Sequence, residues 1–130
     1  MIIVTAEPVD PSAVFDKLKK SEAGSVLFHY AVVKSRAGDR STEGIHFERA
    51  GDMEAELSAI ESEMKARWSL EDVLLVRRLG VLDVGDIISL VAVSSPASLD
   101  AFEACRHGLE RLKTMKTLKK TERITNRERS

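Results

Sequence analysis

The sequence contains a single cysteine, few prolines and no long apolar run, and each of these shortages excludes a class of protein. A membrane-spanning helix needs about 20 consecutive apolar residues, which this chain lacks. The first residues, MIIVTAEPVD, have neither the basic start nor the small-residue cleavage site of an export signal. The single Cys105 cannot form an internal disulfide. We therefore expect a cytoplasmic protein that makes no contact with a membrane.

The standard signatures of catalysis are also missing. The chain has no glycine-rich phosphate loop and no nucleophile elbow. Its three histidines, His29, His46 and His107, lie in separate segments and form no cluster with metal-ligand spacing, so we expect neither a metal site nor a cofactor. Cys105 falls on an apolar helical stripe, where a thiol is usually a small buried hydrophobe.

What the chain does have is an ordinary globular composition, with 43% hydrophobic and 32% charged residues. Its 130 residues suit one domain spanning residues 1–130. The net charge of −1 disfavours a nucleic-acid partner, but residues 113–130 form a basic C-terminal tail with seven basic and two acidic residues. Such a tail is either a solvated, partly frayed helix end or a set of lysines that bind phosphate or act in catalysis.

The residue pattern in the first half of the chain predicts three strands and two helices. We expect strands at residues 1–5, 25–33 and 44–49, and a mobile loop at residues 34–43, which are polar and contain Gly38. A first helix begins at Pro11, with Asp10 as its N-cap, and ends at Gly24. Residues 52–68 carry a regular apolar stripe, which predicts a second helix.

The residue pattern in the second half of the chain predicts two strands, at residues 73–79 and 87–95. We expect them to pair across a turn at residues 80–86. A last helix starts near Ser95 or Ser98, with a buried stripe made of Leu99, Phe102, Cys105, Leu109 and Leu112. The order of elements predicts an α+β, two-layer fold with three helices against a mostly antiparallel sheet. The Arg77-Arg78 pair near a strand end could bind an anion, because a guanidinium offers bidentate donors. The two are adjacent strand residues, so at most one of them faces any given site.

Several segments, read in order, carry short motifs with regular spacing. These are Phe28 and Val32; Gly38-Asp39; Phe47-Glu48; Met53–Trp68; Arg78-Leu79-Gly80; Gly85-Asp86; Val91–Ser95; Ala101–Ala104; and Leu112-Lys113-Thr114 followed by Lys120 and Glu122. Together they resemble the large, catalytic subunit of molybdopterin synthase over nearly the full chain.

The resemblance implies a hammerhead-like α/β fold and a homodimer. It also implies a partner, a small ubiquitin-like sulfur-carrier subunit whose Gly-Gly C-terminus enters the large subunit. The carrier's thiocarboxylate would supply sulfur to a pterin phosphate substrate, cyclic pyranopterin monophosphate, in molybdenum cofactor biosynthesis. The large subunit needs no cysteine for this reaction.

The same resemblance suggests roles for individual residues. Lys113 would lie beside the thiocarboxylate, and Lys120 would hold the substrate or intermediate. Arg78 would position the substrate, and Glu122 would orient the lysines. We expect Lys34, Arg36 and Arg40, in the predicted loop, to supply further positive charge.

The chain departs from the family pattern where Tyr30 and Val33 replace a glycine and an arginine, and where Ala97-Ser98 replaces a His-Arg pair. The last aromatic strand of the family also has no counterpart before Ser130. Two hypotheses follow: an active sulfur transferase, or a degenerate relative that binds the carrier without turnover. A third makes the basic tail a salt-sensitive contact for nucleic acid or an acidic partner.

Overall fold

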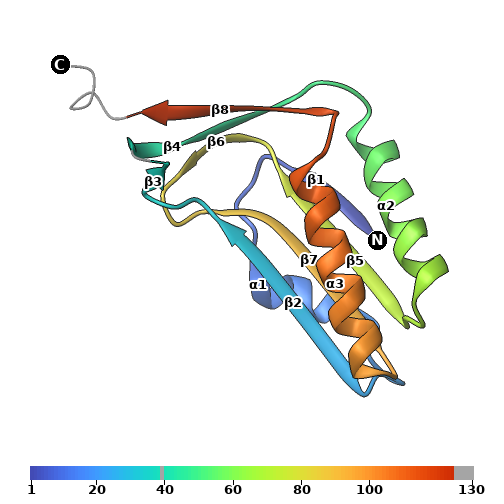
Figure 1. Cartoon of the computed structure of the whole chain (residues 1–130). Coiled ribbons are helices and arrows are strands. Elements are labelled where there is room, and N and C mark those ends of the chain that lie inside the picture. Colours follow the sequence, from blue (N-terminus) through green and yellow to red (C-terminus); the bar gives the residue numbers. More distant parts are fainter. Residues whose placement is uncertain (39, 125–130) are drawn as a thin grey trace.

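The computed structural model describes residues 1–38 and 40–124. Asp39 of the Gly38-Asp39 motif, and Arg127 and Arg129 of the basic tail, lie outside the described residues. The elements, in chain order (Figure 1), are β1 (Ile2–Thr5), α1 (Pro11–Lys17), β2 (Ser25–Val32), β3 (Arg36–Ala37), β4 (Arg40–Arg49), α2 (Met53–Arg67), β5 (Asp72–Arg78), β6 (Gly80–Asp83), β7 (Ile87–Ser95), α3 (Ser98–Lys113) and β8 (Leu118–Ile124).

The first sheet has the strand order β1-β5-β7-β2. β1 runs parallel to β5, whereas β5, β7 and β2 are antiparallel to their neighbours. The predicted pairing of the strands at 73–79 and 87–95 is confirmed, with Leu75 opposite Val91. β5 and β7 are the inner strands, so they are buried on both faces and read as continuous apolar runs.

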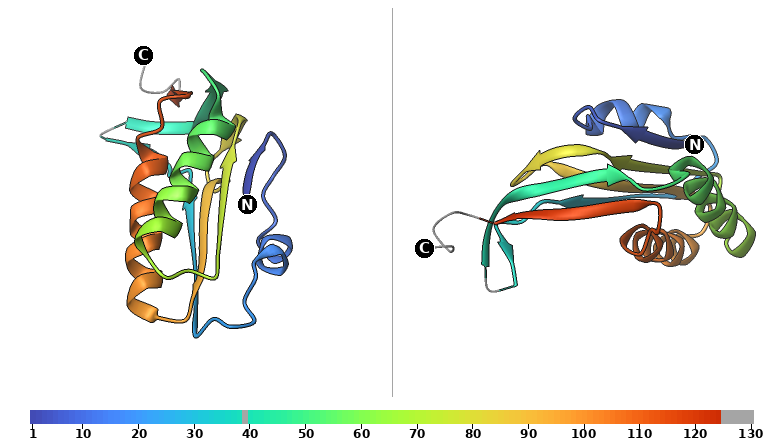
Figure 2. Two further views of the ribbon diagram at one scale, coloured as in Figure 1. Left: turned by 90° about the vertical axis from the view of Figure 1, so that its right-hand side faces the viewer. Right: turned by 90° about the horizontal axis from the view of Figure 1, so that it is seen from above.

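Helices cover both faces of this sheet, as the two views of Figure 2 show. Leu75, Val91 and Val93 point to the face covered by α2 and α3. Their neighbours Leu74 and Leu90 point to the opposite face, where the short α1 packs. The alternation of strand side chains therefore divides the core into two apolar layers.

The predicted helix at residues 52–68 is confirmed as α2. Asp52 caps its N-terminus, because the carboxylate accepts a hydrogen bond from the Ala55 N–H at 3.0 Å. The predicted stripe of Leu57, Ile60 and Met64 is fully buried against the sheet. Within the described residues no helix combines the length and the apolar character that crossing a bilayer requires.

A second group of strands extends away from the helices, and we call β3, β4, β6 and β8 the arm (Figure 1). β4 is central and pairs antiparallel with β3, β6 and β8. The arm has a small core of its own, in which Val33, Ile45, Phe47 and Leu82 are buried.

The structure of the arm differs from three of the predictions made from the sequence. Residues 118–124 of the basic tail are not a frayed helix end but form β8, because Leu118 packs on the arm core and the strand supplies hydrogen bonds to β4. The segment predicted as a mobile loop contains β3 and the start of β4, joined at Gly38 with a positive φ of 65°. The predicted turn at residues 80–86 contains β6, which pairs with β4.

The buried face of α3 also differs from the prediction. Leu99 and Phe102 are 68% and 63% exposed, so assigning them to the core was wrong. Ala101, Ala104 and Gly108 are buried instead, together with Cys105 and Leu112, which were predicted correctly. Small residues let the helix approach the sheet closely, and this contact outweighs the apolar surface of the larger side chains.

The first helix is shorter than predicted, since α1 ends at Lys17 and not near Gly24. The Lys20 ammonium donates hydrogen bonds to the carbonyl oxygens of Phe15 and Leu18, both at 2.9 Å. These bonds satisfy backbone acceptors at the helix end, where intrahelical partners are lacking.

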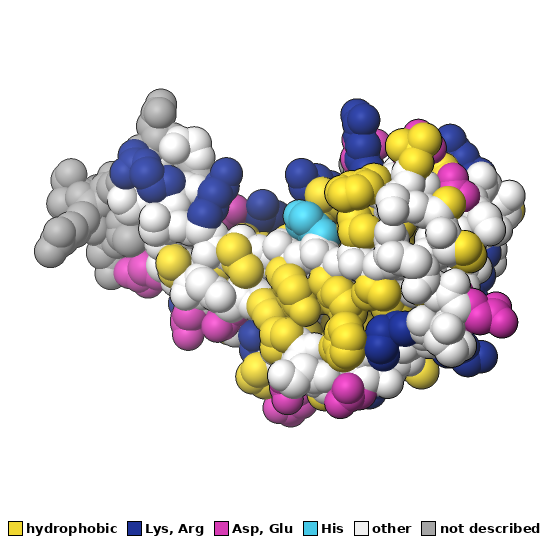
Figure 3. Space-filling view, turned by 90° about the horizontal axis from the view of Figure 1, so that it is seen from below, with side chains coloured by type: hydrophobic (Ala, Val, Ile, Leu, Met, Phe, Trp, Pro, Cys, Tyr) yellow, Lys and Arg dark blue, Asp and Glu magenta, His cyan; other side chains and the backbone are white. Residues whose placement is uncertain are grey.

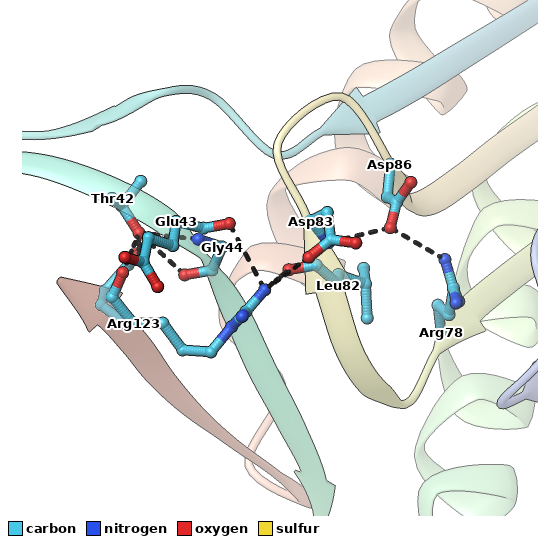
Figure 4. A network of polar contacts seen from close by, with 9 residues as sticks. Thr42, Glu43, Gly44, Arg78, Leu82, Asp83, Asp86 and Arg123 are labelled. Atoms are coloured by element: carbon cyan, nitrogen blue, oxygen red, sulfur yellow. Dashed lines mark hydrogen bonds and ion pairs between the residues drawn. The ribbon is translucent and has the colours of Figure 1, made fainter. Parts of the chain in front are cut away.

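Polar contacts hold the strands of the arm together (Figure 4). The Arg123 side chain on β8 donates to the Leu82 carbonyl and to Asp83 Oδ1 of β6, both at 2.8 Å. The Thr42 hydroxyl lies 2.9 Å from the Arg123 carbonyl and accepts a hydrogen bond from the Gly44 N–H at 3.1 Å. Gly44 therefore sits where β4, β6 and β8 meet.

We predict that Gly44→Ala lowers the free energy of unfolding by about 1–3 kcal/mol, the usual range for an overpacked site. A Cβ at this position would lie 2.0 Å from the Leu82 carbonyl oxygen and 2.2 Å from Arg123 Nη2. Chemical denaturation would measure the change. Glu43→Ala, in the exposed side chain next to it, is the control. Equal stability of the two variants would contradict the prediction.

Candidate functional site

A cleft of about 530 Å³ opens between the arm and the C-terminal end of α3. Residues of β2, β4, β5, β7, α3 and β8 line it. Seen from below in Figure 3, the surface is hollowed between two lobes, with Lys or Arg and one His side chain at the hollow. The two groups of strands and the end of one helix thus converge on a single cavity.

Five of the seven predicted site residues line this cleft: Lys34, Arg36, Lys113, Lys120 and Glu122. Lys113 is the last residue of α3. Lys120 and Glu122 are two residues apart on β8 and therefore point to the same side of the strand. The fold brings these three together because β8 returns along β4 after α3 has ended.

Glu122 pairs with one of the two predicted lysines. Its Oε1 lies 3.2 Å from Lys120 Nζ, and its Oε2 lies 3.3 Å from the Thr42 hydroxyl. Lys113, in contrast, makes no ion pair or hydrogen bond with its side chain among residues 1–38 and 40–124. Its ammonium is exposed at the edge of the cleft.

Arg78 and Arg40 do not line the cleft. Arg78 points to the α1 side of the sheet, where its Nη1 lies 3.6 Å from Asp86 Oδ2 (Figure 4). The same carboxylate oxygen accepts a hydrogen bond from the Asp83 N–H at 2.8 Å, so this pair belongs to the turn between β6 and β7. Arg40 is exposed at the start of β4.

The neighbouring Arg77 lines the cleft instead, although the family motif selected Arg78 from this pair. Its side chain is 7% exposed and lies 4.6 Å from the centre of the Phe47 ring. Burial lowers the pKa of Arg77 to about 10, which still leaves the guanidinium protonated at neutral pH. The alternation of strand side chains could have identified Arg77, because Val73 and Leu75 lie on the same face of β5 and are buried under the helices.

The positions that depart from the family pattern fall in different places. Tyr30 lines the cleft, whereas Val33 is buried in the arm core. Ala97 and Ser98 lie at the start of α3, and a 16-residue helix is roughly 24 Å long. They are therefore remote from Lys113, and their substitution removes no donor from the cleft of the same chain.

Cys105 does not belong to the cleft. It is buried between α3 and the sheet, and burial raises the pKa of its thiol, so the predicted packing role is confirmed. Within the described residues no three His, Cys, Asp or Glu side chains gather as metal ligands would.

The connection between α3 and β8 is fixed from α2. The Glu56 carboxylate accepts hydrogen bonds from the Thr117 hydroxyl at 2.6 Å and from the N–H groups of Lys116 and Thr117 at 3.0 and 3.1 Å. Since Lys113 precedes this connection and Lys120 follows it, Glu56 helps to set the distance between them.

The chain matches known proteins of one family. The family model described as "MoaE protein" matches residues 4–115. The molybdopterin synthase catalytic subunit of Haemophilus influenzae is 31% identical over 131 residues, which cover 98% of this chain and 87% of the relative. The corresponding subunit of Bacillus subtilis is 28% identical over 120 residues, which cover 92% of this chain and 76% of the relative.

Solved structures agree with these matches. The molybdopterin synthase from Staphylococcus aureus has a TM-score of 0.87 and 27% identity, and the match covers 95% of this chain and 91% of that one. A complex of subunits 1 and 2 of the molybdopterin-converting factor from Helicobacter pylori has a TM-score of 0.71 at 15% identity, with 96% and 86% covered, and shares the fold.

We predict that Glu56→Gln lowers the free energy of unfolding by about 1–2 kcal/mol at pH 7, because a neutral amide accepts these hydrogen bonds less strongly. Burial raises the pKa of Glu56, but the hydrogen bonds from Thr117 and Lys116 outweigh it and the net pKa is lowered from 4.5. The carboxylate's contribution is therefore present above about pH 4.5 and is lost as the pH falls further.

Thermal unfolding of the wild type and of Glu56→Gln, measured at several values between about pH 3 and pH 8, would check this prediction. The difference between their unfolding temperatures should become smaller at acidic pH. Glu7→Gln is the control, because the Glu7 side chain makes no hydrogen bond or ion pair with described residues. A difference that is constant with pH would contradict the assignment.

Proposed function

Because the chain belongs to the MoaE family, we propose that it is the catalytic subunit of a molybdopterin synthase, which transfers sulfur from a thiocarboxylated small subunit to cyclic pyranopterin monophosphate. The observation that carries this proposal is the cleft in which Lys113, Lys120 and Glu122 meet. Its volume suits a small-molecule ligand. A cytoplasmic location accords with the single cysteine, which remains a thiol.

The charges of the cleft fit both partners of the reaction. Lys34, Arg36, Arg77, Lys113 and Lys120 line it with one carboxylate, Glu122, so the lining attracts anions. The thiocarboxylate of a sulfur carrier and the phosphate of the pterin are both anionic. The Helicobacter pylori relative was solved as a complex of two subunits, which supports a small protein partner for this chain.

Within this proposal Lys113 binds the thiocarboxylate. Its ammonium is exposed and makes no ion pair with described residues, so it is available to a protein tail arriving from solvent. A cation there stabilises negative charge on the carbonyl oxygen during attack. Lys120, held by Glu122 at 3.2 Å, contacts the substrate or intermediate. Lys34 and Arg36 add positive charge, whereas Arg78 and Arg40 lie outside the cleft.

A degenerate relative that binds the carrier without turnover is not favoured. The missing arginine and His-Arg pair were its support, but the cleft keeps Lys113, Lys120 and Glu122 together. The curated relatives that the chain matches are catalytic subunits. The buried Val33 leaves the other cations of the cleft in place.

We also propose a homodimer formed through β2. This strand is an edge of the first sheet and carries Phe28, Tyr30 and Val32. Figure 3 shows hydrophobic side chains gathered on this side of the molecule. One end of β2 meets the start of α3, where Ser25 Oγ lies 2.6 Å from Ser98 Oγ, and the other end lines the cleft. An antiparallel β2–β2 pair would therefore place the start of each α3 beside the other cleft.

We predict that Lys113→Ala reduces dithiolene formation by roughly 100-fold or more, as expected for the loss of a preorganised charge. The assay mixes the purified protein with a thiocarboxylated sulfur carrier and cyclic pyranopterin monophosphate. Lys116→Ala is the matched control, since Lys116 is exposed in the connection after α3 and does not line the cleft. Wild-type turnover in Lys113→Ala would refute the role of Lys113. Carrier binding without turnover by the wild-type chain would support the degenerate relative.

We predict that light scattering gives twice the 14.4 kDa monomer mass. Phe28→Lys should give a folded monomer, because charge in the middle of β2 opposes its pairing with a second copy. Val81→Lys, at an exposed residue of the arm, should remain dimeric. A monomeric wild-type protein would rule out this dimer, and circular dichroism would show whether each variant is folded.

A further inference from the structure

The floor of the cleft is a row of side chains on three adjacent strands. Arg77 of β5 lies opposite Ser89 of β7, and Ser89 lies opposite Ala31 of β2. His29 comes one row further along the same face of β2, opposite Val91. Val91 and Leu75 belong to the core beneath α3, so the polar row begins where the helix stops covering the sheet.

Two of these side chains have enclosed nitrogen atoms without a partner. Arg77 makes no hydrogen bond or ion pair with the described part of the chain, and its Nε is fully enclosed. His29 Nδ1 is likewise enclosed without a partner. Ser89, which is 2% exposed, adds a hydroxyl to the same row. The floor therefore presents a guanidinium, an imidazole and a hydroxyl.

A guanidinium in this position is costly for the unliganded protein. Burying a charge without a counter-ion opposes folding, and the Phe47 ring compensates for only part of that cost. The one carboxylate in the cleft lining, Glu122, is already held by Lys120. An anionic ligand would supply the missing counter-charge.

We propose that Arg77, assisted by Ser89 and His29, binds the phosphate group of the substrate at the floor of the cleft. This inference rests on the proposed function for the identity of the substrate. A phosphate has more acceptor oxygens than a carboxylate and can use a guanidinium fork, a hydroxyl and an imidazole together. The carrier's tail arrives from solvent and meets the exposed Lys113 first.

The proposal gives the chain a phosphate site that is independent of Val33 and of Ala97-Ser98. Those positions carry no cationic side chain, whereas Arg77 and Ser89 lie on the inner strands β5 and β7. A donor on an inner strand is held more rigidly than one on a loop, so the phosphate is bound by a preorganised group.

The test compares Arg77→Met with Arg78→Met. Both remove a buried arginine from neighbouring positions of β5, but Arg78 faces the other side of the sheet and is paired with Asp86. Calorimetry would measure binding of cyclic pyranopterin monophosphate, and thermal shift would measure binding of inorganic phosphate. Acetyl-Gly-Gly, with a free carboxylate, serves as the probe for the carrier's tail.

In Arg77→Met the affinity for both phosphate compounds should fall roughly 10–100-fold, as for the loss of a charged hydrogen bond. The unliganded variant should melt higher than the wild type, since an uncompensated charge is gone. Binding of acetyl-Gly-Gly should be unchanged. Arg78→Met should keep phosphate binding and melt lower.

Phosphate binding that is unchanged in Arg77→Met would overturn the proposal. Selective loss of acetyl-Gly-Gly binding would also overturn it, because Arg77 would then serve the carrier's tail. Phosphate binding that depends on Arg77, in a chain that shows no sulfur transfer, would uphold this site and refute the proposed function alone.

Discussion

The close contact between α3 and the first sheet determines where the cleft lies. Gly108 faces the sheet, and a Cβ there would come within 3.0 Å of Val91 Cγ1 and 3.1 Å of the Met64 side chain. The helix can approach β7 this closely because Ala101 and Ala104 are also small. This packing places the end of α3 above the row of Leu75 and Val91. The next row toward the arm on this face contains Arg77 and Ser89, which line the cleft.

The arm forms the other wall, and polar contacts join its strands to one another and to α2. Arg123 joins β8 to β6, and Thr42 joins β8 to β4. Glu56 ties the connection that leads into β8 to α2. Lys120 and Glu122 thus lie on a strand that is fixed at both ends, which limits the motion of these two charged groups in the cleft that Lys113 also lines.

Local patterns in the sequence predicted those helices and strands in which buried apolar residues recur at regular spacing. α2 and the pairing of β5 with β7 follow from apolar periodicity, and both predictions are confirmed. The cumulative motifs identified the family correctly. β8 could not be predicted in this way, because its residues LKKTERI have little apolar character and become a strand only through pairing with β4.

The site was predicted only in part, for a related reason. Lys113, Lys120 and Glu122 were selected through the family motif, and the fold brings them to one cleft. Motif matching also selected Arg78, although the side chain that enters the cleft is that of Arg77. The choice between them depends on which face of β5 the helices cover, and this is a property of the tertiary fold.

Arg77 also shows how stability and binding can oppose each other at one residue. Its pKa of about 10 means that burial destabilises the charged form, so the folded chain carries an unfavourable charge at neutral pH. An apolar side chain of similar size would suit the same environment better, since Leu75 occupies the next position on that face. The arginine is therefore better explained by a bound anion than by the requirements of folding. The same argument does not apply to Arg78, because Asp86 lies 3.6 Å away and supplies its counter-charge within the chain.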